Sequence, residues 1–221
     1  MYENLLLLPY FQGMSRDDIT TILDKITFEF RKYCDGDTIF HSGDSCDHFA
    51  ILTKGGAVCT RKSPDGTYSI TEEIDTPFAI EPYSMFGYNT VYKRGYKSKG
   101  ECTVLLIKKH YLFSDFTRNN IFNINFLNLI SRKAQKVSHD IWNSTPTSIE
   151  GRIAHFIAIR CEIPKGKKHI SIKMERLASI LCETRLNVSK ALNALQEKGF
   201  LELHRGEIVV HALEKLTEEV R

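Results

Sequence analysis

The sequence lacks any apolar run long enough to cross a membrane. The longest apolar run near the start of the 221 residues is Leu5–Leu8, which Pro9 ends, whereas a membrane-spanning helix needs about 20 such residues. The residues before this run include Glu3 but neither Lys nor Arg, so a secretory signal peptide is not expected. These absences predict a cytoplasmic protein without a membrane partner.

Clustered metal ligands and catalytic groups are also missing. The six cysteines form no CxxC pair and no cluster with histidine, so reduced structural thiols are expected rather than a metal or iron–sulfur site. No nucleophile–base set and no phosphate-binding glycine loop is visible. The sequence therefore predicts neither an enzyme, nor a metal site, nor a required cofactor. The cysteines are Cys34, Cys46, Cys59, Cys102, Cys161 and Cys182.

Charge is present in both signs but is unevenly distributed. The net charge is +3. Residues 1–145 carry 17 basic and 17 acidic side chains, whereas residues 146–213 carry 11 basic and 7 acidic ones. This basic excess in the last third is too small to establish nucleic-acid binding by itself.

Short strand-like runs alternate with turns between about Phe28 and Ile107. The runs are rich in β-branched and aromatic residues, and Gly and Asp mark the turns between them. Strands of this length and spacing indicate a sandwich or barrel. The clearest runs are Thr38–Phe40, Phe49–Leu52, Ala57–Thr60 and Cys102–Ile107, and the expected turns are Asp35–Asp37, Ser42–Asp44, Lys54–Gly56 and Pro64–Gly66.

Two helices are expected beside these strands. A short one begins at Ser15, and a long one spans Ser114 to Trp142, a segment without Pro or Gly. Apolar residues recur along the long helix at steps of three or four, which favours a partner helix over packing wholly on its own sheet. A second copy of the chain would provide such a partner, and packing wholly on its own sheet is the alternative. The residues assigned to this contact are Ile124, Leu127, Ile130, Ala134 and Val137.

The last third of the chain has the pattern of a winged helix-turn-helix. Thr145–Thr147 breaks the helical pattern and marks the expected boundary. Two short helices are expected within residues 174–198, with Thr184 capping the second, and a β-hairpin within residues 200–210. Ahead of them the sequence predicts a helix at Ile149–Cys161, a basic turn at Pro164–Lys168 and a strand at Ile170–Ile172.

The second of these short helices carries side chains that suit DNA bases. A recognition helix places its N-terminal residues in the major groove, where Arg, Asn and Lys can donate hydrogen bonds to guanine and adenine. Basic residues elsewhere are expected to contact phosphates. A protein-interaction role for the helix-turn-helix is the alternative. The predicted DNA-binding residues are Thr184, Arg185, Asn187, Ser189 and Lys190 on the helix, Arg205 at the wing tip, and Lys167 and Lys168 in the basic turn.

Four groups of residues occur in an order and spacing that match one family. They are Gly36–Phe40 with Gly43–Asp44, Phe49–Leu52 with Gly55, Glu150–Ala154, and the segment from Leu177 to Leu201. In them the chain resembles the CRP/FNR family of bacterial transcription regulators. The resemblance implies an α+β fold with a double-stranded β-roll, a jelly roll of the cyclic-nucleotide-binding type, at 1–113, a dimerisation helix at 114–144 and a winged helix-turn-helix at 145–221.

The resemblance also implies a function for the chain. It predicts a homodimeric, sequence-specific DNA-binding transcription regulator with an inverted-repeat operator, and RNA polymerase as a further partner if the protein activates. The family's base-contacting positions fall on Arg185, Leu186 and Lys190. Leu186 replaces a Glu of the cyclic-AMP receptor branch and cannot accept a hydrogen bond from cytosine. Cys182 replaces the usual turn Gly and is expected to be a small buried residue.

The ligand pocket departs from the family pattern. Of the Gly-Glu pair that holds the ribose in the family, only Glu81 is kept, and Val91–Gly95 contains no Arg-Ser pair for the phosphate. Cyclic AMP is therefore disfavoured, and both another small effector and no effector stay open. A cupin-type metal enzyme would need close histidines, and no HxH occurs. The candidate pocket residues are Glu81, Tyr83, Lys93 and Arg94.

Overall fold

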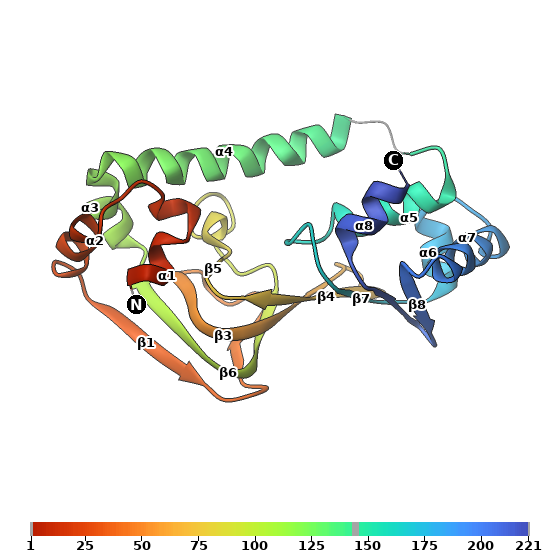
Figure 1. Ribbon diagram of the computed structural model, residues 1–221, viewed down its shortest axis with the longest axis horizontal. Helices are drawn as coiled ribbons and strands as arrows, with labels where there is room; N and C mark the ends of the chain where they lie inside the picture. The colour runs from red at the N-terminus through yellow and green to blue at the C-terminus, as the bar shows by residue number, and fades with distance from the viewer. Residues whose placement is uncertain (1, 143–145, 221) are drawn as a thin grey trace. The chain divides into compact units, whose positions relative to one another are not determined.

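The computed structural model describes residues 2–142 and 146–220 (Figure 1). These residues form two compact units, each with helices and strands, so the predicted α+β class is confirmed. The roll unit comprises the residues up to Val58 together with Ile74–Ile141, and the helix-turn-helix unit comprises Cys59–Glu73 and the residues from Trp142 onward.

The sheet of the roll unit is centred on its longest strands. The strand order is β1-β6-β3, with β2 also paired to β6 and β5 paired to β3. β1 and β6 are antiparallel, with Phe28 opposite Ile107. The strands are β1 Phe28–Tyr33, β2 Thr38–Phe40, β3 His48–Lys62, β5 Phe78–Ile80 and β6 Gly95–Lys108.

Aromatic rings hold the helices of the roll unit against β3. The fully buried Phe122 of α4 lies 5.5 Å from Phe11 and 6.3 Å from Phe49 between ring centroids. Such aromatic contacts contribute beyond the apolar area that they bury, and they anchor the first turn of α4. The helices are α1 Tyr2–Leu6, η1 Pro9–Phe11, α2 Arg16–Leu23, η2 Pro82–Ser84, α3 His110–Ser114, η3 Phe116–Arg118 and α4 Asn120–Trp142.

Helix starts follow local capping chemistry. Asp18 N–H donates to Ser15 Oγ, and Ser15 N–H donates to Asp18 Oδ2, so the predicted start of α2 at Ser15 is confirmed. The long helix begins at Asn120 and not at Ser114, which corrects the prediction. Asn119 Oδ1 accepts from the N–H groups of Ile121 and Phe122 and therefore caps α4 at that point.

The turn predicted at Lys54–Gly56 is wrong. β3 runs through it as one strand, because Gly55 adopts φ +78° and lets the backbone pass close to β6. A Cβ at Gly55 would lie 2.1 Å from the Glu101 carbonyl oxygen. A glycine inside a strand can mark a close backbone approach as well as a turn.

In the helix-turn-helix unit the strands β4, β7, β9 and β8 are antiparallel neighbours in that order, in a sheet in which β4 also pairs with β3. The helices of this unit pack around a shared core that includes Ile153, Leu177 and Leu192. The predicted winged helix-turn-helix is confirmed. The elements are β4 Tyr68–Asp75, α5 Ile149–Ala158, β7 Lys168–Ile172, α6 Met174–Ile180, α7 Arg185–Glu197, β8 Leu201–His204, β9 Glu207–Val210 and α8 Leu213–Glu219.

One strand of this sheet comes from the middle of the roll sequence. The predicted division into 1–113, 114–144 and 145–221 places Cys59–Glu73 with the roll, whereas its contacts group it with the C-terminal residues. In Figure 1, β4 runs beside β7. The predicted boundary at residue 145 lies outside the described residues.

The described helices include none long and apolar enough to cross a membrane. Within the same residues, no group of three or more His, Cys, Asp or Glu side chains is placed to hold a metal ion. All six cysteines are free thiols. Cys182 is exposed and has φ +53°, so its predicted burial is wrong. It adopts the left-handed backbone of the turn Gly that it replaces, and this backbone does not bury its side chain.

Candidate nucleic-acid interface and ligand pocket

The exposed face of α7 is fixed by its buried face. Val188, Leu192 and Leu195 recur at helical spacing and are buried in the core of the unit. Thr184 Oγ1 accepts from the Asn187 N–H at 3.2 Å, so the predicted cap is confirmed. The N-terminal turns of α7 therefore present their other side chains to solvent. Arg185, Leu186, Lys190 and Asn193 are exposed, and Asn187 and Ser189 are partly buried.

Arg185 is available to a partner. Its Nη1 lies 3.5 Å from Glu175 Oε1, but the two side chains remain 70% and 75% exposed. An ion pair as exposed as this one contributes little to stability. Arg185 can therefore leave Glu175 for a base edge at small cost.

Asn187 and Arg152 hold the turn of the helix-turn-helix. Glu183 accepts from Arg152 Nη2 and from Asn187 Nδ2, and these bonds, that from Arg152 first, lower the pKa of Glu183. Arg152 Nη1 also donates to the Leu181 carbonyl at 2.9 Å. Arg152 thus ties α5 to the residues just before α7. This role of Arg152 was not predicted from the sequence, although Arg152 lies in one of the motifs that carry the family resemblance.

The basic residues outside α7 divide into exposed and buried ones. Arg205 and Lys167 are exposed, as a phosphate contact requires. Lys168 is 1% exposed, and its Nζ lies 2.9 Å from Glu72 Oε2. The phosphate contact predicted for Lys168 is wrong because Lys168 belongs to β7 and lies directly opposite Glu72 of β4. Its ammonium is held inside the unit.

Glu81 is the centre of a buried polar cluster in the roll unit. Its side chain is buried, and its carboxylate accepts from Ser84 Oγ, Tyr96 OH and the backbone N–H groups of Lys93 and Arg94 at 2.8–3.0 Å. Buried carboxylates need this degree of hydrogen bonding. Tyr96, which comes from β6, was not among the predicted pocket residues.

The other predicted pocket residues join this cluster to different extents. Arg94 is buried, lies 3.8 Å from Glu81 and donates from Nη1 to Tyr83 OH at 3.0 Å. Lys133 of α4 places its Nζ 4.5 Å from the centre of the Tyr83 ring, a cation–π contact. Lys93 contributes its backbone N–H to Glu81. The cluster therefore connects the roll to the long helix.

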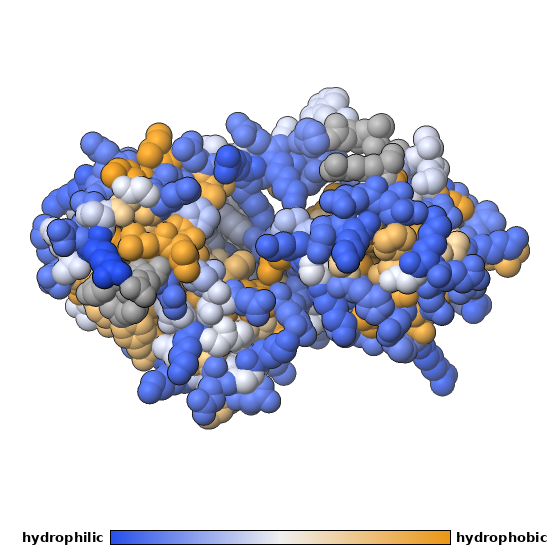
Figure 2. Space-filling model, in the orientation of Figure 1, coloured by the Kyte–Doolittle hydropathy of each residue, from blue (hydrophilic) through white to orange (hydrophobic). Residues whose placement is uncertain are grey.

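The first half of α4 presents apolar side chains to solvent. Ile124 is 54% and Leu127 is 52% exposed, and Val137 in the second half is similar. Ala134 is exposed as well, whereas Ile130 is partly buried. Figure 2 shows apolar residues at the surface along the first half of α4. The described chain leaves this stripe uncovered.

Comparisons with known proteins agree with both units. A cyclic nucleotide-binding domain model matches residues 30–119, and a Crp-like helix-turn-helix domain model matches residues 151–219. The CRP-like cAMP-activated global transcriptional regulator of Mycobacterium tuberculosis is 21% identical over 223 residues, 96% of each chain. The structure of Thermus thermophilus catabolite activator protein shares the fold, with a TM-score of 0.55 and 20% identity over 96% of this chain and 98% of that one. The roll, the winged helix-turn-helix and these matches place the chain in the CRP/FNR family of DNA-binding transcription regulators.

Proposed function

We propose that the chain acts as a homodimer that reads an inverted-repeat operator in double-stranded DNA. The observation that carries this proposal is the exposed polar N-terminus of α7, supported by the uncovered apolar stripe of α4. Two recognition helices related by a dimer axis contact successive major grooves about 34 Å apart. The operator half-sites are therefore centred about 10 base pairs apart.

Each side chain of the interface has a distinct role in this proposal. Arg185 donates two hydrogen bonds to guanine O6 and N7, and Lys190 contacts a neighbouring base. Leu186, which is 64% exposed, is suited to the methyl group of thymine. Arg205 and Lys167 contact phosphates, which set affinity without reading sequence. Thr184 caps α7 and Ser189 lies on it beside these residues, and Asn187 positions the helix through Glu183.

Operator selection from a random DNA pool, followed by titrations at several salt concentrations, tests these roles. Arg185→Ala is expected to cost about 1–3 kcal/mol per half-site and to relax preference at one base. Lys167→Ala is expected to weaken binding to all DNA sequences alike and to make the affinity less dependent on salt. Lys198→Ala is the control, because it removes a lysine at the opposite end of α7 that binds Glu219.

Two results would contradict this assignment. If Arg185→Ala weakened binding to the operator and to scrambled DNA equally, Arg185 would have no base-reading role. Failure of the intact protein to select any DNA would favour a helix-turn-helix that binds another protein.

The dimer is tested on α4. Leu127→Glu and Ile124→Glu each place a charge in the apolar stripe, so monomers and loss of operator binding are expected together. Light scattering measures the first effect, and DNA titration measures the second. Lys136→Glu is the matched control because it puts the same carboxylate on the opposite side of the helix. A Leu127→Glu protein that stays dimeric would exclude this interface.

We further propose that cyclic AMP is not the effector and that no cofactor is required. The Mycobacterium tuberculosis relative is named as cAMP-activated, but here Glu81 already accepts four hydrogen bonds and Arg94 is bound to Tyr83. Gly95 supplies no hydroxyl for a phosphate. Calorimetry is expected to show no micromolar binding of cyclic AMP. Such binding, with a change in operator affinity, would overturn the proposal and leave the DNA-reading role intact.

A further inference from the structure

The hairpin formed by Cys59–Glu73 is built into the sheet of the helix-turn-helix unit. Its strand β4 pairs with β7 over five consecutive residues, from Tyr68 opposite Ile172 to Glu72 opposite Lys168. β3 and β4 both continue into the roll unit, because β3 begins at His48 and β4 ends at Asp75. The two strands therefore form a second covalent connection between the units, separate from the chain that follows α4.

Buried charge holds the hairpin to β7 and to the segment before it. The Glu72 carboxylate accepts from the N–H groups of Glu162 and Ile163 at 2.7 and 3.0 Å and from Lys168 Nζ at 2.9 Å. The Glu72 and Lys168 side chains are 2% and 1% exposed. Separating β4 from β7 would leave the charges of Glu72 and Lys168 without partners, which is strongly unfavourable for buried ions.

The hairpin tip also binds the first helix of the helix-turn-helix. Arg176 of α6 donates from Nε to Thr67 Oγ1 at 2.9 Å and from Nη2 to Asp65 Oδ2 at 2.6 Å. A two-point contact of this kind fixes orientation as well as distance. The position of the tip is therefore coupled to the position of α6.

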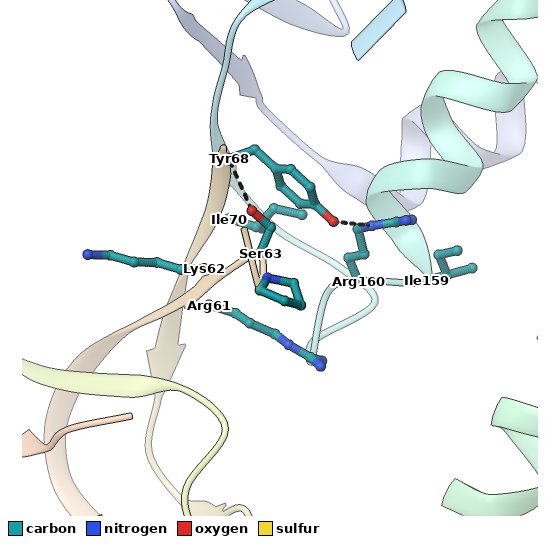
Figure 3. A pocket seen from close by; sticks show the side chains of 8 residues that line it. Arg61, Lys62, Ser63, Tyr68, Ile70, Ile159 and Arg160 are labelled. Carbon is teal, nitrogen blue, oxygen red and sulfur yellow. Dashed lines mark hydrogen bonds between the residues drawn. The ribbon is translucent and has the colours of Figure 1, made fainter. Parts of the chain in front are cut away.

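A third contact lies beside a hollow of about 240 Å³. Arg160, two residues after the end of α5, donates from Nε to Tyr68 OH at 2.9 Å, and the Tyr68 N–H donates to Ser63 Oγ (Figure 3). The Tyr68 ring lies 5.4 Å from the ring of Phe156, which belongs to α5. The Arg160 guanidinium also lies 4.2 Å from the centre of the Phe156 ring. The hairpin thus contacts α5, β7 and α6, three elements of the helix-turn-helix unit.

We propose that the hairpin is a permanent part of the DNA-binding unit and carries regulatory changes from the roll to α6 and α7. The inference rests on the proposed DNA-reading function and deepens it. In this arrangement a shift of β3 or β4 in the roll moves the hairpin tip. The tip then moves α6 through Arg176, and α7 with it.

A disulfide across the ladder tests whether the pairing is permanent. Ser69 lies directly opposite Ser171, a separation that a disulfide can span. In a protein whose exposed Cys34 and Cys182 are replaced by Ser, Ser69→Cys with Ser171→Cys is expected to oxidise fully. The oxidised protein should bind the selected operator within about twofold of its reduced form. Ser69→Cys with His169→Cys, offset by two residues, is the control and should cross-link poorly.

If the cysteines at positions 69 and 171 failed to cross-link, the proposed permanent pairing of β4 with β7 would be wrong. Loss of operator binding on oxidation, with recovery on reduction, would show that the hairpin must leave β7. Cross-linking is measured by mass spectrometry and needs no DNA. A protein that cross-links but selects no DNA would therefore refute the proposed function without refuting the ladder.

A double-mutant cycle tests the coupling to α6. Asp65→Ala and Arg176→Ala each remove one side of the same contact, so each is expected to weaken operator binding by roughly threefold to tenfold, and the double variant no further. Asp65 and Arg176 are 45% and 38% exposed, so the variants are expected to fold. Unchanged affinity in both single variants, or fully additive losses, would overturn the coupling.

Discussion

Among the described residues, each unit contains a buried carboxylate bound by a cation and by backbone N–H groups, but the two sites are assembled differently. The partners of Glu81 in the roll unit lie 3 to 15 positions away along the chain. The partners of Glu72 in the helix-turn-helix unit lie 90 to 96 positions away. Glu81 therefore organises a local loop, whereas Glu72 can be satisfied only after the hairpin has met the C-terminal segment.

The cations also differ in how closely they depend on the carboxylate. Lys168 Nζ lies 2.9 Å from Glu72, whereas Arg94 Nη1 lies 3.8 Å from Glu81 and 3.0 Å from Tyr83 OH. A buried charge that loses its partner is costly. The difference implies that removing Glu72 disturbs its unit more than neutralising Glu81 disturbs the roll.

The largest expected effect is that of Glu72→Ala. The substitution leaves the buried Lys168 without its partner and should lower the free energy of unfolding by about 3–5 kcal/mol. Urea denaturation followed by circular dichroism measures this loss. Adding Lys168→Met to Glu72→Leu should recover part of it, because an apolar pair can replace a buried ion pair. If Glu72→Ala lowered the free energy of unfolding by less than about 1 kcal/mol, the Glu72–Lys168 pair would contribute no more than an exposed ion pair.

Glu81→Gln should have a smaller effect. The amide keeps the shape of the carboxylate but presents one oxygen to donors that now bind two, so a loss of about 1–3 kcal/mol is expected. Arg94 keeps its bond to Tyr83. The same urea titration allows direct comparison with Glu72→Gln, which should cost more. An equal cost for the two variants would remove the distinction between the local and the long-range site.

Tyr83→Phe isolates the second partner of Arg94. The variant removes one hydrogen bond while keeping the ring under Lys133, so a loss of about 1 kcal/mol is expected. Tyr88→Phe is the matched control because Tyr88 is fully exposed. A stable Tyr83→Phe protein, indistinguishable from the Tyr88→Phe control, would show that the hydroxyl does not stabilise Arg94.

The smallest effect concerns the titration of Asp65 at the hairpin tip. Hydrogen bonds from Ser63 and Thr67 lower the pKa of Asp65 from 3.8 to about 2. A carboxyl group whose pKa is lowered by folding stabilises the folded state when the pH is above its ordinary pKa. This contribution disappears as the pH falls through the lowered pKa. Titration by carbon-detected NMR should show the low pKa, and Ser63→Ala should raise it. An unchanged value in Ser63→Ala would exclude Ser63 as the main cause.

Features that depend on near neighbours in sequence could be predicted. The capping box at Ser15, the Thr184 cap and the apolar face of α7 each involve residues within a few positions of one another. Helical periodicity and capping act over that distance. The winged helix-turn-helix was predictable for the same reason. The cluster around Glu81 was predictable in part, because its centre lies in one short segment.

Features that depend on distant backbone could not be predicted in this way. Gly55 resembled a turn residue, but Glu101 of the neighbouring strand determines its role. Lys168 resembled an exposed basic residue because its sequence neighbours are basic, yet Glu72 lies opposite it across a strand pair. A pattern of single residues carries no information about which strand will lie alongside.

The sequence by itself determined the kinds of elements, their order and the polar N-terminus of the recognition helix, because these follow from local propensity, periodicity and capping. Tertiary structure alone decided that the hairpin Cys59–Glu73 belongs to the DNA-binding unit, that Lys168 is buried and that Cys182 is exposed. Hydrogen bonds between strands and the burial of a paired charge are properties of two segments together. Only the folded chain brings those segments within reach of each other.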